Sequence, residues 1–419
     1  MTGDGGTAMI PLPDAIGPDR TAVLAFVSDS GVEGALIDGF SGLLPQPLET
    51  RRGGIRTAIA ALQRAPSPRV LIVDVSGEEQ PLTALGTLSD VVEPQVTVLV
   101  VGELSDLNFY RAITRDLGAT EYLARPLTRD VVARHFGPFA LGQAPAAEAV
   151  LGGRLLTVTG VRGGIGASTV AVNLAWHFGV TARRHTVLLD PDVQMGTAAF
   201  LLNVQPGNGL SVALETPERI DALFVERSAQ PVADRLHVLA AEEKLATMPA
   251  LAPAATMHLL DSLRRRYNFI VADVPFGPVP LYRDLLDAAN QRVFVMEPSL
   301  AAVRDTLRLL GLPAAEQQHR KSVIVLNRAG RAGGLNRRQV EDALKMKVDV
   351  VIPELPRVVG QAATLGEPAI TRGGVFRSAI VDLARQVAFT RLLDSATATA
   401  SGAVAGEAKS RWWLLRWRR

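Results

Sequence analysis

The chain of 419 residues has no cysteine and only six histidines. The first absence excludes disulfide bonds, a cysteine nucleophile, a thiolate zinc site and a cysteine-ligated iron–sulfur cluster. The histidines show no metal-binding spacing such as H-E-x-x-H. We therefore expect neither redox chemistry nor a structural zinc site.

Long apolar runs and a strong excess of one charge are also lacking. No apolar stretch reaches the roughly 18 residues that a membrane-spanning helix needs. Residues 1–20 have no basic start followed by an apolar run, so they do not resemble a secretory signal. The formal net charge of +2, from 44 basic and 42 acidic residues, is too small to favour a nucleic-acid partner. These features predict a cytoplasmic protein.

Two blocks of apolar strands alternating with helical segments are present. The first has four β-rich runs, TAVLAFV, RVLIVDV, VTVLVVG and EYLARP, typical of a small parallel α/β sheet. The second has seven, beginning with LLTVT and ending with VDVVI, which predicts a doubly wound, mostly parallel sheet. The predicted organisation is a flexible leader (1–20), a first α/β domain (21–137), a linker (138–153), a second α/β domain (154–394), a tether (395–410) and a basic, tryptophan-rich tip (411–419).

A glycine-rich segment opens the second block. An apolar strand runs into RGGIGAST, where Gly163, Gly164 and Gly166 let the backbone curl with its N–H groups inward. Ser168 and Thr169 place hydroxyls in the first turn of the next helix, whose positive end favours anions. The segment predicts a phosphate-binding loop.

The loop departs from the Walker A pattern G-x-x-x-x-G-K-[ST] at two positions. Val161 occupies the first glycine position and Ala167 the lysine position. A glycine turn between strand and helix can also be purely structural. Other segments must therefore support the assignment.

Three aspartates at the ends of predicted strands give that support. Asp190 and Asp192 follow one strand and Asp273 ends a later one. Because the carboxyl ends of parallel strands meet at the edge that holds the phosphate loop, these carboxylates could surround a magnesium ion and a terminal phosphate. Each alone would more often be a helix cap or a turn former.

The segments RGGIGAST, LLDPDVQMGTAAFLL, VADVP, VLNR and IPELPRVVGQAATLGEPA resemble those of the MinD/ParA deviant Walker ATPases. More narrowly, the sequence resembles the CpaE/TadZ proteins of Flp/Tad pilus assembly over residues 20 to 394. That resemblance implies a degenerate receiver-like (flavodoxin-like) domain followed by a MinD/ParA-like ATP-binding domain. It also implies an ATP-dependent homodimer and partners in the pilus secretion machinery.

The resemblance assigns roles to single residues. Arg162 stands at the signature lysine that reaches across the dimer, and Asp192 at the carboxylate that orients the attacking water. Ser168 stands at the magnesium-coordinating hydroxyl, and Asp190 and Asp273 at metal positions reached partly through water. The expected contacts to ATP come from Gly163, Gly164, Ile165, Gly166, Ala167, Ser168, Thr169, Asn327 and Pro353.

Ala167 predicts binding without efficient turnover. Losing one charge-assisted hydrogen bond costs about 1.5 to 3 kcal/mol, which backbone N–H groups and magnesium can partly offset. Losing a cation at the transferring phosphoryl group costs on the order of a thousandfold in rate. We expect slow or absent hydrolysis, with Arg162 either a partial substitute in trans or a solvated loop cation.

In the first domain, Asp74 stands where receivers keep the phospho-accepting aspartate. Arg125 replaces the usual lysine, Gly102 stands at the switch hydroxyl, and only Ser28 and Asp29 stand where an acidic pair would hold magnesium. A scaffold that binds partners or dimerises is therefore favoured over a phosphorylated receiver.

The tip, 411–419, holds four arginines and three tryptophans and no acid. This composition suits an anionic membrane surface, docking on a pilus-machine protein, or a solubilising tail. The leading hypothesis is an ATP-gated pilus assembly factor in the cytoplasm, at the inner membrane or at a cell pole. The alternatives are a hydrolysing positioning or partition ATPase and a phospho-regulated signalling protein.

Overall fold

The computed structural model describes residues 21–143, 153–246, 250–315, 318 and 321–388. The predicted leader, tether and tip lie outside these residues, as does most of the predicted linker. Within the described ranges, no helix has the length and apolar character needed to cross a membrane.

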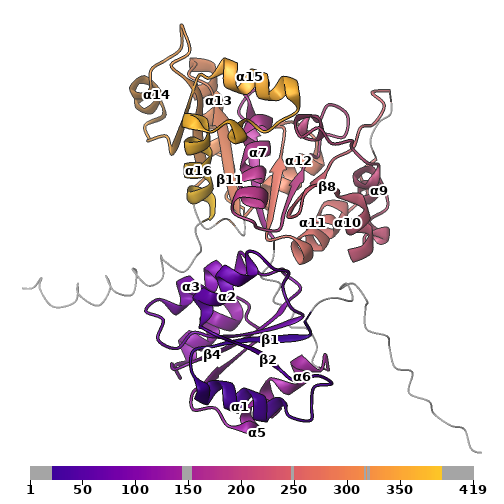
Figure 1. Cartoon of the computed structure of the whole chain (residues 1–419). Helices are drawn as coiled ribbons and strands as arrows, with labels where there is room; N and C mark the ends of the chain where they lie inside the picture. The colour runs from indigo at the N-terminus through magenta and orange to yellow at the C-terminus, as the bar shows by residue number, and fades with distance from the viewer. Residues whose placement is uncertain (1–20, 144–152, 247–249, 316–317, 319–320, 389–419) are drawn as a thin grey trace, which may run out of the picture.

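The first domain is a five-stranded parallel sheet with helices on both faces (Figure 1). Its strand order, β2-β1-β3-β4-β5, is the flavodoxin-like order, which confirms the predicted receiver-like fold. Two apolar cores cover the two faces of the sheet. The elements are β1 (Val23–Val27), α1 (Ser30–Phe40), β2 (Glu49–Arg52), α2 (Ile55–Leu62), β3 (Val70–Asp74), α3 (Pro81–Ser89), β4 (Thr97–Gly102), α4 (Leu107–Arg111), β5 (Glu121–Ala124), α5 (Arg129–His135) and α6 (Gly137–Ala140).

The second domain is an eight-stranded sheet of order β13-β12-β11-β6-β10-β7-β9-β8, parallel except for the β8–β9 pair. This confirms the doubly wound, mostly parallel fold. Its strands are β6 (Arg154–Gly160), β7 (Thr186–Leu189), β8 (Gln230–Ala233), β9 (Leu236–Leu239), β10 (Phe269–Asp273), β11 (Gln291–Met296), β12 (Val323–Ala329) and β13 (Val350–Pro353). Its helices are α7 (Ala167–Trp176), α8 (Ala198–Leu201), α9 (Gly209–Glu215), α10 (Ala222–Ser228), α11 (Ala255–Arg266), α12 (Pro280–Asp287), α13 (Leu300–Leu310), α14 (Arg337–Leu344), α15 (Pro356–Leu365) and α16 (Gly374–Ala388).

The central strands are buried because helices cover both faces of each sheet. Every residue of β1, β3 and β10 is buried, as expected for continuous apolar runs in parallel sheets. One core of the second domain lies under α7, α13 and α16, and another under α9 to α12. In α7 and the helical turn that follows it, Val170, Leu174 and Phe178 are buried at four-residue spacing.

The structure adds two strands that the sequence did not predict. Both β2 and β8 are edge strands, bonded to a neighbour on one side only. Neither contains a buried residue, so neither carries an apolar pattern. The chain also stays packed beyond residue 137, because Ala140 in α6 is buried although the predicted linker begins at 138.

Candidate functional site

The glycine-rich loop joins β6 to α7 in a conformation that depends on its glycines. Gly164 and Gly166 have φ values of 75° and 92°, in the left-handed region that side chains rarely adopt. Val161 and Ile165 are buried and hold the loop against the core, whereas Arg162, Gly163 and Gly164 are exposed. The exposed part of the loop is therefore open to a ligand.

Asn327, near the end of β12, holds the loop by a hydrogen bond to its backbone. Its Nδ2 donates to the carbonyl oxygen of Ile165 at 2.7 Å, and its Oδ1 accepts from the backbone N–H of Arg328 at 2.9 Å. A Cβ on Gly166 would lie 2.6 Å from this Nδ2. The structure thus brings Asn327 to the loop, and its contact with ATP stays a prediction.

The aspartates lie at the same edge of the sheet. Asp190 and Asp273 are buried, with 2% and 7% of their surface exposed, and the Ser168 side chain at the start of α7 faces the Asp273 carboxyl and opposes the rise of its pKa. The Asp190 carboxylate accepts from the backbone N–H groups of Ala198 at 3.0 Å and Asp192 at 3.2 Å. Asp192 is half-buried and accepts from the N–H of Met195 at 3.0 Å.

The two buried carboxyls are costly to ionise. Burial, reinforced by the charge of Asp190, raises the pKa of Asp273 to about 7. Burial also raises the pKa of Asp190 to about 6, although backbone donors oppose the rise. No lysine or arginine among the described residues forms an ion pair with either carboxyl, so a cation at this edge would relieve the cost.

Magnesium fits this donor set through water. In the described part of the chain, no three His, Asp or Glu side chains converge closely enough to hold a metal ion by themselves. A hydroxyl and two buried carboxylates beneath a phosphate loop instead suit an ion that keeps several water ligands and takes others from phosphate. Ser168, Asp190 and Asp273 are the residues that would hold it.

Arg162 points to an acidic partner in its own chain. Its Nη1 donates to Oδ2 of Asp305 on α13 at 2.7 Å, and Arg304 pairs with the other carboxylate oxygen. The hydrogen bonds from Arg304 and Arg162 lower the pKa of Asp305. Asp305 was not predicted, because nothing in its local sequence marks a contact across 143 residues.

The remaining predicted contacts lie at the end of the loop and on a more distant strand. Ala167 and Thr169 lie half-buried in the first turn of α7. Pro353 ends β13, opposite Ala329 of β12, and is three strands away from β6 in the sheet. Its contact with ATP stays a prediction.

In the first domain, Asp74 is fully occupied by donors of its own chain. Only 1% of its surface is exposed, and it accepts from the Ser28 hydroxyl, the Ser28 N–H at 3.1 Å and the Ser76 N–H at 2.9 Å. Arg125 forms an ion pair with Asp29. A Cβ at Gly102 would lie 2.8 Å from the Tyr122 hydroxyl, so a side chain there would require its neighbours to shift. Asp74 connects β1 to β3, which favours the scaffold interpretation.

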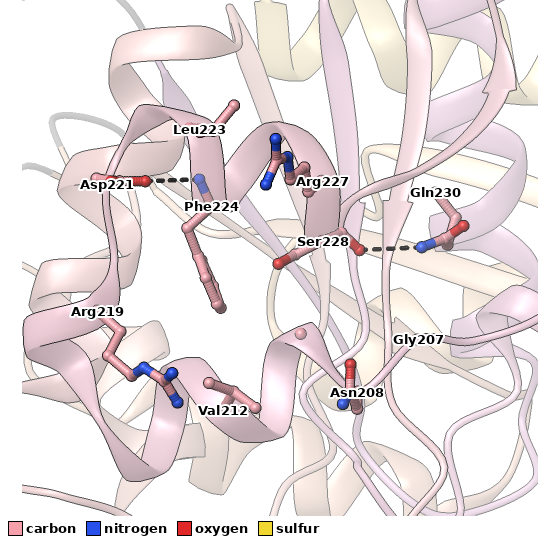
Figure 2. A pocket seen from close by; sticks show the side chains of 11 residues that line it. Gly207, Asn208, Val212, Arg219, Asp221, Leu223, Phe224, Arg227, Ser228 and Gln230 are labelled. Atoms are coloured by element: carbon pink, nitrogen blue, oxygen red, sulfur yellow. Dashed lines mark hydrogen bonds between the residues drawn. The ribbon is translucent and has the colours of Figure 1, made fainter.

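A separate pocket of about 440 Å³ lies beside the edge strand β8 (Figure 2). The guanidinium groups of Arg219 and Arg227 stand on either side of it, and the ring of Phe224 points into it. None of the predicted site residues lines this pocket.

Comparison with known proteins concerns mainly the second domain. The profile of the family described as "Cellulose biosynthesis protein BcsQ" matches residues 154–335. The septum site-determining protein MinD of Bacillus subtilis is 23% identical over 188 residues, 42% of this chain and 65% of that protein. MinD of Synechocystis sp. is 26% identical over 222 residues, 52% of this chain and 82% of that protein. A solved ParA family ATPase from Chlorobium tepidum TLS has a TM-score of 0.51 at 18% identity and covers 56% of this chain and 98% of its own.

These matches agree with the geometry of the loop and the strand order. The second domain has the fold of the MinD/ParA-like ATPases, and its sequence is similar to the BcsQ family model and to MinD proteins. The MinD/ParA-like fold expected from RGGIGAST and the strand-end aspartates is confirmed for this domain.

Proposed function

We propose that this protein is an ATP-binding, ATP-dimerising assembly factor of the Flp/Tad pilus machinery with weak or absent hydrolysis. The observation that carries the nucleotide part is the pair of buried carboxyls, Asp190 and Asp273, next to Ser168 at the end of an open, glycine-dependent loop. The pilus part is supported by the sequence motifs shared with CpaE/TadZ proteins.

Different residues of the site would bind the phosphate groups and the metal ion. The N–H groups of the loop, from Gly163 to Thr169, would bind the phosphate oxygens, and Asn327 would keep the loop in shape. Bound magnesium would neutralise phosphate charge. Ser168 would meet it with its hydroxyl, while Asp190 and Asp273 would orient its water ligands.

Slow hydrolysis follows from what surrounds the transferring phosphoryl group. Ala167 offers no cation, and Arg162 is engaged by Asp305 in its own chain. Asp192 is oriented by backbone donors and remains available to position water. Catalysis of phosphoryl transfer depends on a correctly placed positive charge, so turnover should stay low until Arg162 is released toward a partner.

Self-association is supported by apolar side chains at this edge of the sheet. Met195, Phe276 and Leu300 follow β7, β10 and β11 and are 68%, 53% and 72% exposed. Exposed apolar groups around a charged site are typical of protein interfaces. A second copy bound over the nucleotide would cover them.

A titration of ATP with magnesium, followed by light scattering for mass, tests binding and self-association together. We expect the mass to double as ATP saturates and to return to that of the monomer with EDTA. A mass that stays constant while nucleotide binds would exclude the dimer. Steady-state phosphate release tests the alternative of a hydrolysing positioning or partition ATPase, which requires turnover comparable to lysine-containing relatives.

A further inference from the structure

The two domains meet at the ends of their sheets opposite the phosphate loop and Asp74. Part of the contact is at the end of α2. Arg235, in the turn between β8 and β9, is 5% exposed, and its Nη2 donates to the carbonyls of Leu62 at 2.9 Å and Ala65 at 3.1 Å. Arg183 Nε donates to the carbonyl of Gln63 at 2.7 Å. The last carbonyls of a helix lack partners within it, so these arginines satisfy the end of α2.

Asn268 makes the corresponding contact at the end of α3. It is 5% exposed, and its Nδ2 donates to the carbonyls of Ser89 at 2.9 Å and Val92 at 2.8 Å. Its Oδ1 accepts from the backbone N–H of His185 at 3.2 Å. Its own carbonyl accepts from the N–H of Arg154 at 2.9 Å. The amide side chain therefore has partners in both domains.

The residues in this contact lead directly into the strands that carry the nucleotide site. Arg154 begins β6, which ends at Gly160 before the loop. His185 precedes β7, which leads to Asp190. Asn268 precedes β10, which ends at Asp273. Asn268 thus joins the starting points of three adjacent strands of the order β6-β10-β7, and holds all three to the first domain.

We propose that the docked first domain positions the nucleotide site, with Asn268 as the positioning residue. This rests on the proposed nucleotide binding, and concerns its regulation. Strands are stiff over four to seven residues and bonded to their neighbours along their length. A change in the positions of the three strand starts relative to one another would therefore be transmitted to the loop, Asp190 and Asp273 at the other ends of these strands. By linkage, nucleotide must tighten the domain contact as much as the contact tightens nucleotide binding.

The first test is hydrogen exchange on the full chain without nucleotide. Asn268→Ala should speed exchange at residues 88–93, where the contact is lost, and also at 190–198, where Asp190 holds backbone N–H groups. The matched control is Gln291→Ala, which also removes a buried amide at the start of a strand. The Nε2 of Gln291 donates to carbonyls of Arg292 and Lys321 within the second domain. The Gln291→Ala variant should leave hydrogen exchange at residues 88–93 unchanged.

The second test is calorimetric titration with ATP and magnesium. Asn268→Ala should weaken binding by about five- to 150-fold relative to wild type, the usual range of coupling between sites. Arg235→Ala should act in the same direction, and Arg235→Lys, which keeps the charge and one donor group but not the forked guanidinium, should recover part of the affinity. If Asn268→Ala does not fold, the two Arg235 variants test the positioning proposal in its place.

The outcomes separate the two proposals. If wild type binds ATP and both Asn268→Ala and Arg235→Ala bind as Gln291→Ala does, positioning is refuted and nucleotide binding stands. If wild type binds no nucleotide, the proposed function fails, and exchange at 190–198 alone decides positioning. If Asn268→Ala speeds exchange only at residues 88–93, the positioning proposal is refuted.

Discussion

Replacing Asp273 by asparagine should stabilise the nucleotide-free protein at alkaline pH. The wild-type carboxyl is 7% exposed, and burial together with the charge of Asp190 raises its pKa from 3.8 to about 7. Each pKa unit corresponds to ~1.4 kcal/mol, so the ionised form lowers the free energy of unfolding by up to ~4 kcal/mol. Asparagine keeps an oxygen that can accept from Ser168 but carries no charge.

The sign follows from the direction of the shift. The folded state binds the proton more tightly than the unfolded state does, so the stability of wild type falls as pH rises from about 4 through about 7. Urea unfolding of both proteins, followed by circular dichroism between pH 4.5 and 8.5 in EDTA, measures the difference. We expect the variant to gain about 2 to 4 kcal/mol over wild type at pH 8.5 and progressively less toward pH 4.5. A difference that does not change with pH would refute the reasoning.

Four other predictions concern the phosphate loop, the Arg162–Asp305 ion pair and Asp74. Gly166→Ala, with its left-handed φ and a Cβ 2.6 Å from Asn327, should cost about 1 to 3 kcal/mol of stability and weaken ATP binding, whereas Gly163→Ala, with open space around it, should not. Ala167→Lys should tighten ATP about ten- to a hundredfold and raise phosphate release by on the order of a thousandfold; equal turnover would contradict the role given to this position. Asp305→Ala should free Arg162 and lower the ATP needed for half dimerisation by up to about fivefold, in line with an exposed ion pair. Acetyl phosphate should not label Asp74, and Asp74→Ala should lower the free energy of unfolding by about 1 to 3 kcal/mol by leaving Ser28 and Ser76 donors unpaired, as denaturation would show.

The features that the sequence predicted are those set by local pattern. The glycines of the loop are needed wherever a strand turns sharply into a helix, and Gly164 and Gly166 have the left-handed backbone that requires them. The strand-end aspartates reached one edge because parallel topology places carboxyl ends together. The buried central strands are continuous apolar runs, which are readily identified.

The features that the sequence did not predict depend on tertiary contacts of polar residues. The edge strand Glu49–Arg52 is recognisable only through its pairing with β1. Pro231 lowers the strand signal of β8, and an edge position tolerates it. Asn268 and Arg235 resemble ordinary turn residues, yet both are buried because they satisfy helix carbonyls in the other domain. Such partners become visible only when the domains are placed together.

Isothermal titration calorimetry of the full chain with ATP and magnesium is the most direct test of whether this loop binds a triphosphate without the usual lysine. We expect saturable heat for ATP and ADP in magnesium, reduced in EDTA and in Gly166→Ala but retained in Gly163→Ala. No heat from either nucleotide at millimolar concentration would contradict the proposed function.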